Sequence, residues 1–185
     1  MKKLRRIALM LLLAVLCFTA GILALSMRFP IRHMDIITAH AGGLEPSLIL
    51  AVIMAESSFD PYARSHAGAQ GLMQLMPPTA ADMAQRMGLA NFEPYHVWNP
   101  EVNIAMGAFY LNLLKARYDG NLDLMLAAYN AGLGNVDRWL ANPDFSRDGQ
   151  TLDTIPFPET ENYLRRIRQF QRIYRILLTL RRANQ

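Results

Sequence analysis

The chain has 185 residues, with 19 Lys and Arg side chains against 15 Asp and Glu, which gives a formal net charge of +4. The first 32 residues hold six of the basic side chains and none of the acidic ones, so the rest of the chain is slightly acidic. The high isoelectric point therefore gives no argument for a nucleic-acid-binding protein. Cys17 is the single cysteine, so the chain after it can form neither a disulfide nor a thiolate zinc site.

The N-terminal segment has the pattern of a targeting sequence. Lys2, Lys3, Arg5 and Arg6 precede an uncharged apolar run over residues 7–25. Such a run is typical of a secretory signal peptide or of a single membrane anchor, and the sequence leaves both open. We expect residues 1–30 to form this signal peptide or anchor, with its basic end in the cytoplasm, and residues 35–185 to form one exported domain.

The chain after the targeting segment has the periodicity of helices, and it shows no alternating strand pattern of useful length. Pro46 is expected to start a helix that is apolar on all sides from Leu48 to Ala55 and is therefore buried. Thr79 is the expected cap of one later helix and Asn99 of the next. We therefore predict an all-α fold with helices within residues 32–46, 46–57, 78–88, 99–120, 121–132, 134–142 and 158–182.

Glu56 stands at the end of the predicted buried helix, directly before a turn-rich loop over residues 57–76. Desolvation by the apolar helix disfavours the ionised form and should raise the pKa of this carboxyl. A raised pKa suits a general acid that works near neutral pH. The alternative is a carboxylate that only accepts hydrogen bonds from nearby amides, which is the commoner situation for a lone glutamate at a helix end.

Two further stretches supply groups that suit a carbohydrate ligand. GAQGLMQLMP over residues 68–77 combines small residues, which let the backbone approach a ligand, with the amide of Gln74, which both donates and accepts hydrogen bonds. This combination suits a sugar with an N-acetyl group. AYNAG over residues 128–132 places Tyr129 and Asn130 just before a helix end. Each stretch alone is equally well explained as a structural turn or a buried tyrosine.

Four ordered motifs carry a resemblance to a known family. They are Glu56-Ser57, Gly68 with GLMQLMP over 71–77, AYNAG over 128–132, and IPFPET over 155–160 with Tyr163. In this order they resemble the soluble lytic transglycosylase (SLT, family 1) domain, over residues 35–175. The resemblance implies a lysozyme-like α fold and an enzyme that cleaves bacterial peptidoglycan.

The resemblance also implies roles for individual residues. Glu56 matches the single catalytic acid and base of the family. The positions implied to bind the glycan strand, or to hold the region that binds it, are Ser57, Ser65, Gln74, Met76, Tyr129, Asn130 and Glu159. Ser57 matches the serine that supports the region beside the acid, and Tyr129 matches the tyrosine that faces it. Glu159 matches a residue that either contacts substrate or supports the site.

The sequence shows no clear second carboxylate to act with Glu56, and this determines the expected mechanism. Most glycosidases place two carboxylates around the bond that they cleave. Asp60 is the acidic residue nearest to Glu56 in the sequence, but Pro61 takes it out of the helix that holds Glu56. The N-acetyl group of N-acetylmuramic acid can replace the missing partner, as in substrate-assisted glycosidases. We therefore expect Glu56 to protonate the glycosidic oxygen and then to deprotonate the muramoyl 6-hydroxyl, which gives 1,6-anhydro-N-acetylmuramic acid.

Two other functions are compatible with these residues. One is a lysozyme-type hydrolase on the same scaffold, in which Asp60 or Glu159 positions a water molecule. The other is a non-catalytic wall-binding component of a secretion apparatus.

The remaining expectations concern cofactors, partners and location. No cofactor is expected, and no metal site is expected from the scattered histidines, which are His33, His40, His66 and His96. The last predicted helix carries a basic stripe, typical of a solvated face, that consists of Arg165, Arg168, Arg172 and Arg175. We expect a monomer in the periplasm or cell envelope, tethered to the cytoplasmic membrane if the N-terminal segment is retained.

Overall fold

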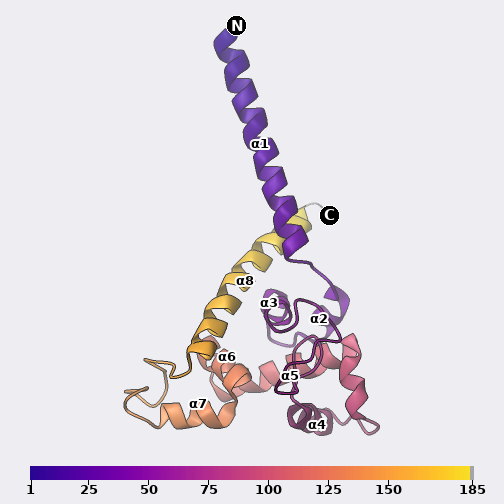
Figure 1. The fold of residues 1–185 in the computed structure, drawn as a ribbon, viewed down its shortest axis with the longest axis vertical. Coiled ribbons are helices and arrows are strands. Elements are labelled where there is room, and N and C mark those ends of the chain that lie inside the picture. The colour runs from indigo at the N-terminus through magenta and orange to yellow at the C-terminus, as the bar shows by residue number, and fades with distance from the viewer. Residues whose placement is uncertain (184–185) are drawn as a thin grey trace. The chain divides into compact units, whose positions relative to one another are not determined.

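The computed structural model describes residues 1–183, except for the side chain of Ala8. The chain divides into two compact units, Met1–Arg32 and His33–Gln185. The first unit holds one helix, α1 (Lys2–Arg28), drawn in indigo in Figure 1. By length and composition α1 could cross a membrane, but a signal sequence near an N-terminus passes the same test. Signal peptide and anchor therefore both stay predictions, and the last two residues of the predicted domain lie outside the described residues.

The second unit is helical. Its elements are α2 (Met34–His40), α3 (Pro46–Glu56), α4 (Pro77–Arg86), the 3₁₀ helix η1 (Pro94–Trp98), α5 (Pro100–Arg117), α6 (Leu122–Ala131), α7 (Leu133–Leu140) and α8 (Pro158–Ala183). Residues 1–183 contain no strand, only isolated bridges that join Gln70 to Arg64 and to Leu75. The predicted all-α fold is confirmed and every predicted helix is present, while η1 is an addition that the sequence pattern did not predict.

Two helix starts show how local sequence sets the boundaries. Asn99 caps α5 as predicted, because its side chain accepts hydrogen bonds from the backbone N–H groups of Glu101 and Val102. The predicted cap of α4 is wrong: α4 starts at Pro77, which places Thr79 in its first turn. Proline has no N–H group to satisfy and its φ angle already suits a helix, so a start at Pro77 needs no side-chain cap.

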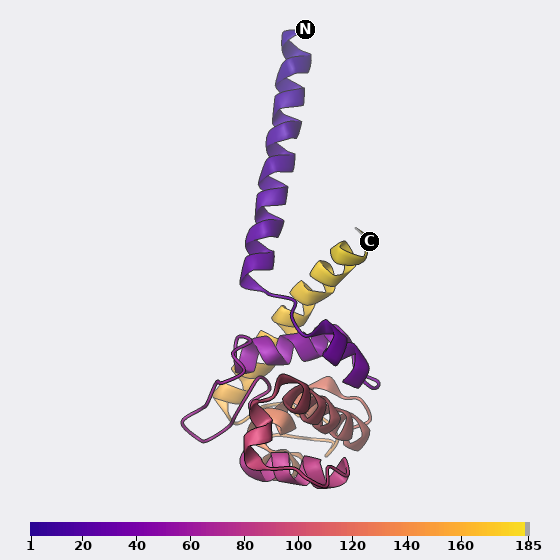
Figure 2. The ribbon, with the colours of Figure 1, turned by 90° about the vertical axis from the view of Figure 1, so that its right-hand side faces the viewer.

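α3 is the buried centre of the second unit, as its uniformly apolar sequence predicts. All its residues from Ser47 to Met54 are buried. α8 packs against α3 and α6, and the two ribbon views show α3 and α8 crossing next to each other (Figures 1 and 2). The end of α3, where Glu56 lies, is therefore enclosed by elements from distant parts of the sequence.

The arginine stripe of α8 is a solvated face that carries ion pairs. These pairs join Arg165 to Glu161, Arg168 to Asp123 and Arg175 to Glu45. Because the paired side chains are about half exposed, each pair contributes roughly 1 kcal/mol or less to stability.

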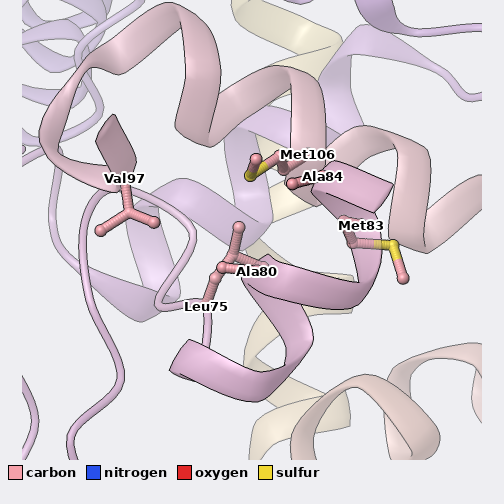
Figure 3. Packing of buried hydrophobic residues seen from close by; sticks show 6 residues of the cluster. All are labelled: Leu75, Ala80, Met83, Ala84, Val97 and Met106. Atoms are coloured by element: carbon pink, nitrogen blue, oxygen red, sulfur yellow. The ribbon is translucent and has the colours of Figure 1, made fainter. Parts of the chain in front are cut away.

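A hydrophobic cluster fixes the loop before α4 to the helical frame. The cluster consists of Leu75, Ala80, Met83, Ala84, Val97 and Met106 (Figure 3). Tyr110 of α5 and Tyr129 of α6 pack against it. Leu75 directly follows Gln74 in the chain, so burial of Leu75 holds the predicted sugar-binding loop in place.

Candidate active site

Glu56 is the last residue of α3, and most of its side chain is buried. Burial raises the pKa of its carboxyl from 4.5 to about 7, and the nearby charge of Glu159 also raises it. A hydrogen bond from Tyr163 and the positive charge of Arg166 lower the same pKa, but desolvation is the largest effect. A carboxyl with this pKa is about half protonated at neutral pH, so it can both give and take a proton.

One face of α8 is directed at this carboxyl. Glu159, Tyr163 and Arg166 are separated by four and three residues, a spacing that places them on one side of a helix. The Tyr163 hydroxyl is buried, makes no hydrogen bond of good geometry within residues 1–183, and interacts with Glu56 through a looser one. Burial, followed by the charge of Glu56, raises the pKa of Tyr163 well above its ordinary value. The acid therefore faces a phenol that stays protonated.

The loop after α3 folds back onto the end of the helix. The Ser57 hydroxyl bridges the carbonyl oxygens of Ile53, at 3.1 Å, and Leu72, at 2.8 Å. Further along, Ser65 Oγ accepts a hydrogen bond from the N–H of Ala69 at 2.9 Å. Both serines thus hold the loop by contacts to its own backbone, and Ser57 fixes the residue next to the acid.

Asn103, buried in α5, fastens the middle of the loop. Its Oδ1 accepts a hydrogen bond from the N–H of Met73 at 2.8 Å, and its Nδ2 donates to the carbonyls of Gln70 at 3.1 Å and Val97 at 2.9 Å. Gly71 leaves the space for this amide, because a Cβ at position 71 would lie 2.2 Å from Asn103 Nδ2. Gly71 also has a φ of +78°, which side-chain-bearing residues rarely adopt.

Gln74 has a left-handed backbone with a φ of +48°, which is uncommon for a residue other than glycine. Its Nε2 donates hydrogen bonds to the carbonyls of Ala63 at 2.8 Å and Gly71 at 2.9 Å. These bonds hold the strained residue and use the amide's donor side. No donor within residues 1–183 reaches its Oε1, so this oxygen can accept a hydrogen bond from a ligand.

A groove of about 200 Å³ runs between the loop, α5 and α6. It is lined by Gln74, Leu75, Met76, Thr79, Tyr110, Tyr129, Asn130, Ala131 and Gly132. The Tyr129 hydroxyl donates to the Met73 carbonyl at 2.7 Å. Burial raises the pKa of Tyr129 well above its ordinary value, and the charge of Glu56 raises it further. Tyr129 therefore connects the groove to the acid, which itself lies just outside the groove lining.

Asn130 ties the groove to the start of α8. Its Oδ1 accepts a hydrogen bond from the Thr160 hydroxyl at 2.8 Å. Thr160 follows Glu159, whose side chain is exposed. The groove and the α8 face that is directed at Glu56 are therefore held together by a direct side-chain contact.

The structure brings most of the predicted site residues together. The groove holds four of them, and Glu159 acts on the acid from α8; the four are Gln74, Met76, Tyr129 and Asn130. Ser57 and Ser65 do not line the groove. Asp60 is also apart: its Oδ1 accepts a hydrogen bond from the N–H of Tyr62 at 2.9 Å, and its charge is not among those that shift the pKa of Glu56.

Other parts of the surface lack this chemistry. Three larger cavities, of about 370, 380 and 620 Å³, contain none of the predicted site residues. Within residues 1–183 no three His, Cys, Asp or Glu side chains lie close enough together to hold a metal ion. The groove beside Glu56 is therefore the best candidate for a site, although it is smaller than these cavities.

Sequence reasoning missed several residues of the site. It assigned no role to Asn103, Tyr110 or Arg166, and quoted Tyr163 only as part of a motif. Asn103 had a signal, since it is a single amide within the otherwise apolar stretch NIAMGAFYL. The spacing of Glu159, Tyr163 and Arg166 was also visible, but only the packing of α8 on α3 shows which way that face points.

The arrangement suits acid–base chemistry on a polar ligand. A single carboxyl with a pKa near neutrality lies beside a groove that offers amides, an aromatic wall and a flexible methionine. The buried phenol of Tyr163 and the guanidinium of Arg166 favour the ionised form of Glu56 once this carboxyl has given up its proton.

Comparison with known proteins points to the family that the four sequence motifs resemble. Residues 35–151 match the family model of the transglycosylase SLT domain. Soluble lytic murein transglycosylase of Salmonella typhimurium is 34% identical over 152 residues, which cover 80% of this chain and 24% of that protein. Membrane-bound lytic murein transglycosylase C of Histophilus somni is 36% identical over 169 residues, which cover 79% and 47%. The chain thus spans about a quarter and about half of the lengths of these two relatives.

A solved structure has the same fold. The crystal structure of an inactive glutamate-to-glutamine mutant of lytic transglycosylase Slt from Pseudomonas aeruginosa superposes with a TM-score of 0.72 and 35% sequence identity. The similarity covers 84% of this chain and 26% of that one. Since the family model matches more than half of the chain, and the fold and the site agree with it, the chain belongs to the transglycosylase SLT domain family.

Proposed function

We propose that this protein is a lytic transglycosylase that cleaves the β-1,4 bond between N-acetylmuramic acid and N-acetylglucosamine in peptidoglycan. The observation that carries the proposal is Glu56, a single acid with its pKa raised to about 7 by burial, beside a groove that contains Gln74 and Tyr129. The names of the relatives, lytic murein transglycosylases, support the same reaction class.

The reaction uses one carboxyl in two steps. Protonated Glu56 gives its proton to the glycosidic oxygen, and the bond from this oxygen to C1 of N-acetylmuramic acid breaks. The N-acetyl oxygen of the same sugar stabilises the positive charge at C1. Ionised Glu56 then takes the proton of the 6-hydroxyl as that oxygen bonds to C1. The products are 1,6-anhydro-N-acetylmuramic acid and a new N-acetylglucosamine end, and no water is consumed.

The groove residues position the sugar for these steps. Gln74 Oε1 accepts a hydrogen bond from an N-acetyl N–H group, and Met76, 40% exposed, packs against the sugar. Tyr129 and Asn130 hold the groove walls through Met73 and Thr160. Glu159 contacts substrate from α8, while Ser57 and Ser65 keep the loop in shape for binding.

Location and partners follow from the substrate. Peptidoglycan lies outside the cytoplasmic membrane, so the domain acts in the periplasm or cell envelope. Retention of α1 would hold it against the membrane, and one relative is named membrane-bound. A monomer is sufficient for this reaction, because one chain supplies both the acid and the groove residues.

The test compares carboxyl-to-amide variants at two positions, Glu56 and Asp60. Glu56→Gln should lower the rate of peptidoglycan cleavage at least 100-fold, a typical loss for removal of a general acid. Asp60→Asn should leave it within about twofold, since that side chain only caps a turn. Anhydro-muropeptides as the main products in mass spectrometry support the proposal. Full activity of Glu56→Gln would exclude this residue as the acid.

A lysozyme-type hydrolase is the second candidate, and one observation favours it. The charge of Glu159 acts on Glu56, so a second carboxylate does lie near the acid. If Glu159 positions a water molecule, Glu159→Gln should abolish activity as fully as Glu56→Gln, and the products should have reducing ends. If Glu159 only contacts substrate, this variant should keep measurable activity and still give anhydro products.

A further inference from the structure

We infer that Arg166 binds a carboxylate on the substrate next to the cleaved bond. This inference rests on the proposed function, because it assigns a partner to a side chain at the same site. The ligand group is a carboxylate on, or attached to, the lactyl arm of N-acetylmuramic acid.

Arg166 and Arg172 are both arginines of α8 without an ion pair to a residue within 1–183, but of the two only the charge of Arg166 acts on Glu56. Arg165, Arg168 and Arg175 are each in an ion pair with a nearby carboxylate. No Asp or Glu within residues 1–183 lies within ion-pairing distance of Arg166, and its side chain is exposed. Its guanidinium is therefore free to bind an anion from outside the protein.

The position of Arg166 is fixed against the site. Its guanidinium carbon lies 5.9 Å from the centre of the Tyr163 ring, which is buried and directs its hydroxyl toward Glu56. Thr160, less than two turns earlier on α8, is bonded to Asn130 in the groove wall. The stacking contact limits the conformations open to Arg166, so less side-chain entropy is lost when it binds a ligand.

The substrate supplies the matching charge. The lactyl arm of N-acetylmuramic acid ends in a free carboxylate where the peptide has been removed. Where the peptide is present, that group is an amide and the nearest carboxylates belong to the peptide. A planar guanidinium forms two parallel hydrogen bonds with a carboxylate of either kind. A glycan of N-acetylglucosamine alone has no such group and gives Arg166 nothing to bind.

The test measures binding in the Glu56→Gln background, so it does not depend on cleavage. The full-length protein, in detergent, is titrated by calorimetry with peptide-bearing glycan strands, peptide-free strands, peptide-free strands whose lactyl carboxyls have been converted to amides, and N-acetylglucosamine tetramer. Each titration is repeated with the double variant that carries both Glu56→Gln and Arg166→Gln. Arg172→Gln is the matched control, because Arg172 is an exposed arginine of the same helix that points about 120° away from Arg166.

We expect Arg166→Gln to weaken binding of a carboxylate-bearing strand about five- to tenfold and to leave binding of the amidated strand and of the tetramer unchanged. Arg172→Gln should change none of them. A loss confined to peptide-free strands identifies the lactyl carboxylate, and a loss confined to peptide-bearing strands identifies the peptide. Equal losses on charged and neutral glycans, or no loss on any, would overturn the inference. Wild-type protein that binds these strands but does not cleave them would refute the proposed function alone.

Discussion

Replacing Glu56 with glutamine should change how the stability of the domain depends on pH. The carboxyl has a pKa of about 7 when folded, against 4.5 for its ordinary value. Below pH 4.5 it is protonated in both the folded and the unfolded states. As pH rises from 4.5 to 7 it ionises in the unfolded chain first, so wild-type stability falls over this range. Glutamine does not ionise, so the variant avoids this loss.

The size of the effect follows from the two pKa values. Their difference corresponds to about 3 kcal/mol, at 1.36 kcal/mol for each tenfold change in the proton equilibrium. The free energy of unfolding of Glu56→Gln, minus that of wild type, should therefore rise by up to about 3 kcal/mol between pH 4 and pH 8. Tyr163 titrates well above this range and does not contribute to the change.

Urea unfolding at several pH values measures this difference. Near-UV circular dichroism reports on the second unit, which contains both tryptophans, Trp98 and Trp139. Asp60→Asn is the control, because the charge of Asp60 is not among those that shift the pKa of Glu56. Parallel stability curves for wild type and Glu56→Gln across this range would show that the carboxyl is not desolvated, and would refute the reasoning.

Two further predictions concern the groups around the acid and the loop. Tyr163→Phe removes a hydrogen bond that lowers the pKa of Glu56, so the alkaline fall in kcat/KM should move to higher pH; an unchanged or lower midpoint would argue against that contact. Gly71→Ala should lower the free energy of unfolding by about 3 kcal/mol, because the new Cβ would lie 2.2 Å from Asn103 Nδ2 at a φ of +78°. Gly88→Ala, at a φ of +69° with no atom within 4 Å, should cost only about 1 kcal/mol, and equal losses in urea unfolding would contradict the role of Asn103.

The sequence predicted the parts of the fold that depend on local pattern. α3 was predictable because every side of it is apolar, and the cap at Asn99 because an amide precedes Pro100 there. Thr79 was the exception, since a proline at the first helical position removes the need for a side-chain cap. Glu56 could be picked out as a perturbed acid from the same local information, because the residues that desolvate it precede it in the helix.

The parts of the site that depend on long-range packing could not be predicted. The contact of Ser57 with the Leu72 carbonyl and that of Asn103 with the Met73 N–H join segments that sequence spacing does not relate. The role of α8 required knowing that its face with Tyr163 packs toward the end of α3. The groove residues Gln74 and Tyr129 were found through a resemblance, because local pattern alone also allowed a plain turn and a buried tyrosine.

The central claim is that a single carboxyl serves both steps because the substrate's own hydroxyl, and not water, attacks C1. Digestion of purified peptidoglycan in isotopically labelled, heavy-oxygen water tests this most directly, with mass spectrometry of the released muropeptides. The account predicts anhydro-muropeptides without labelled oxygen at the new muramic acid end. Reducing-end muropeptides that carry one labelled oxygen, formed at the wild-type rate, would contradict it.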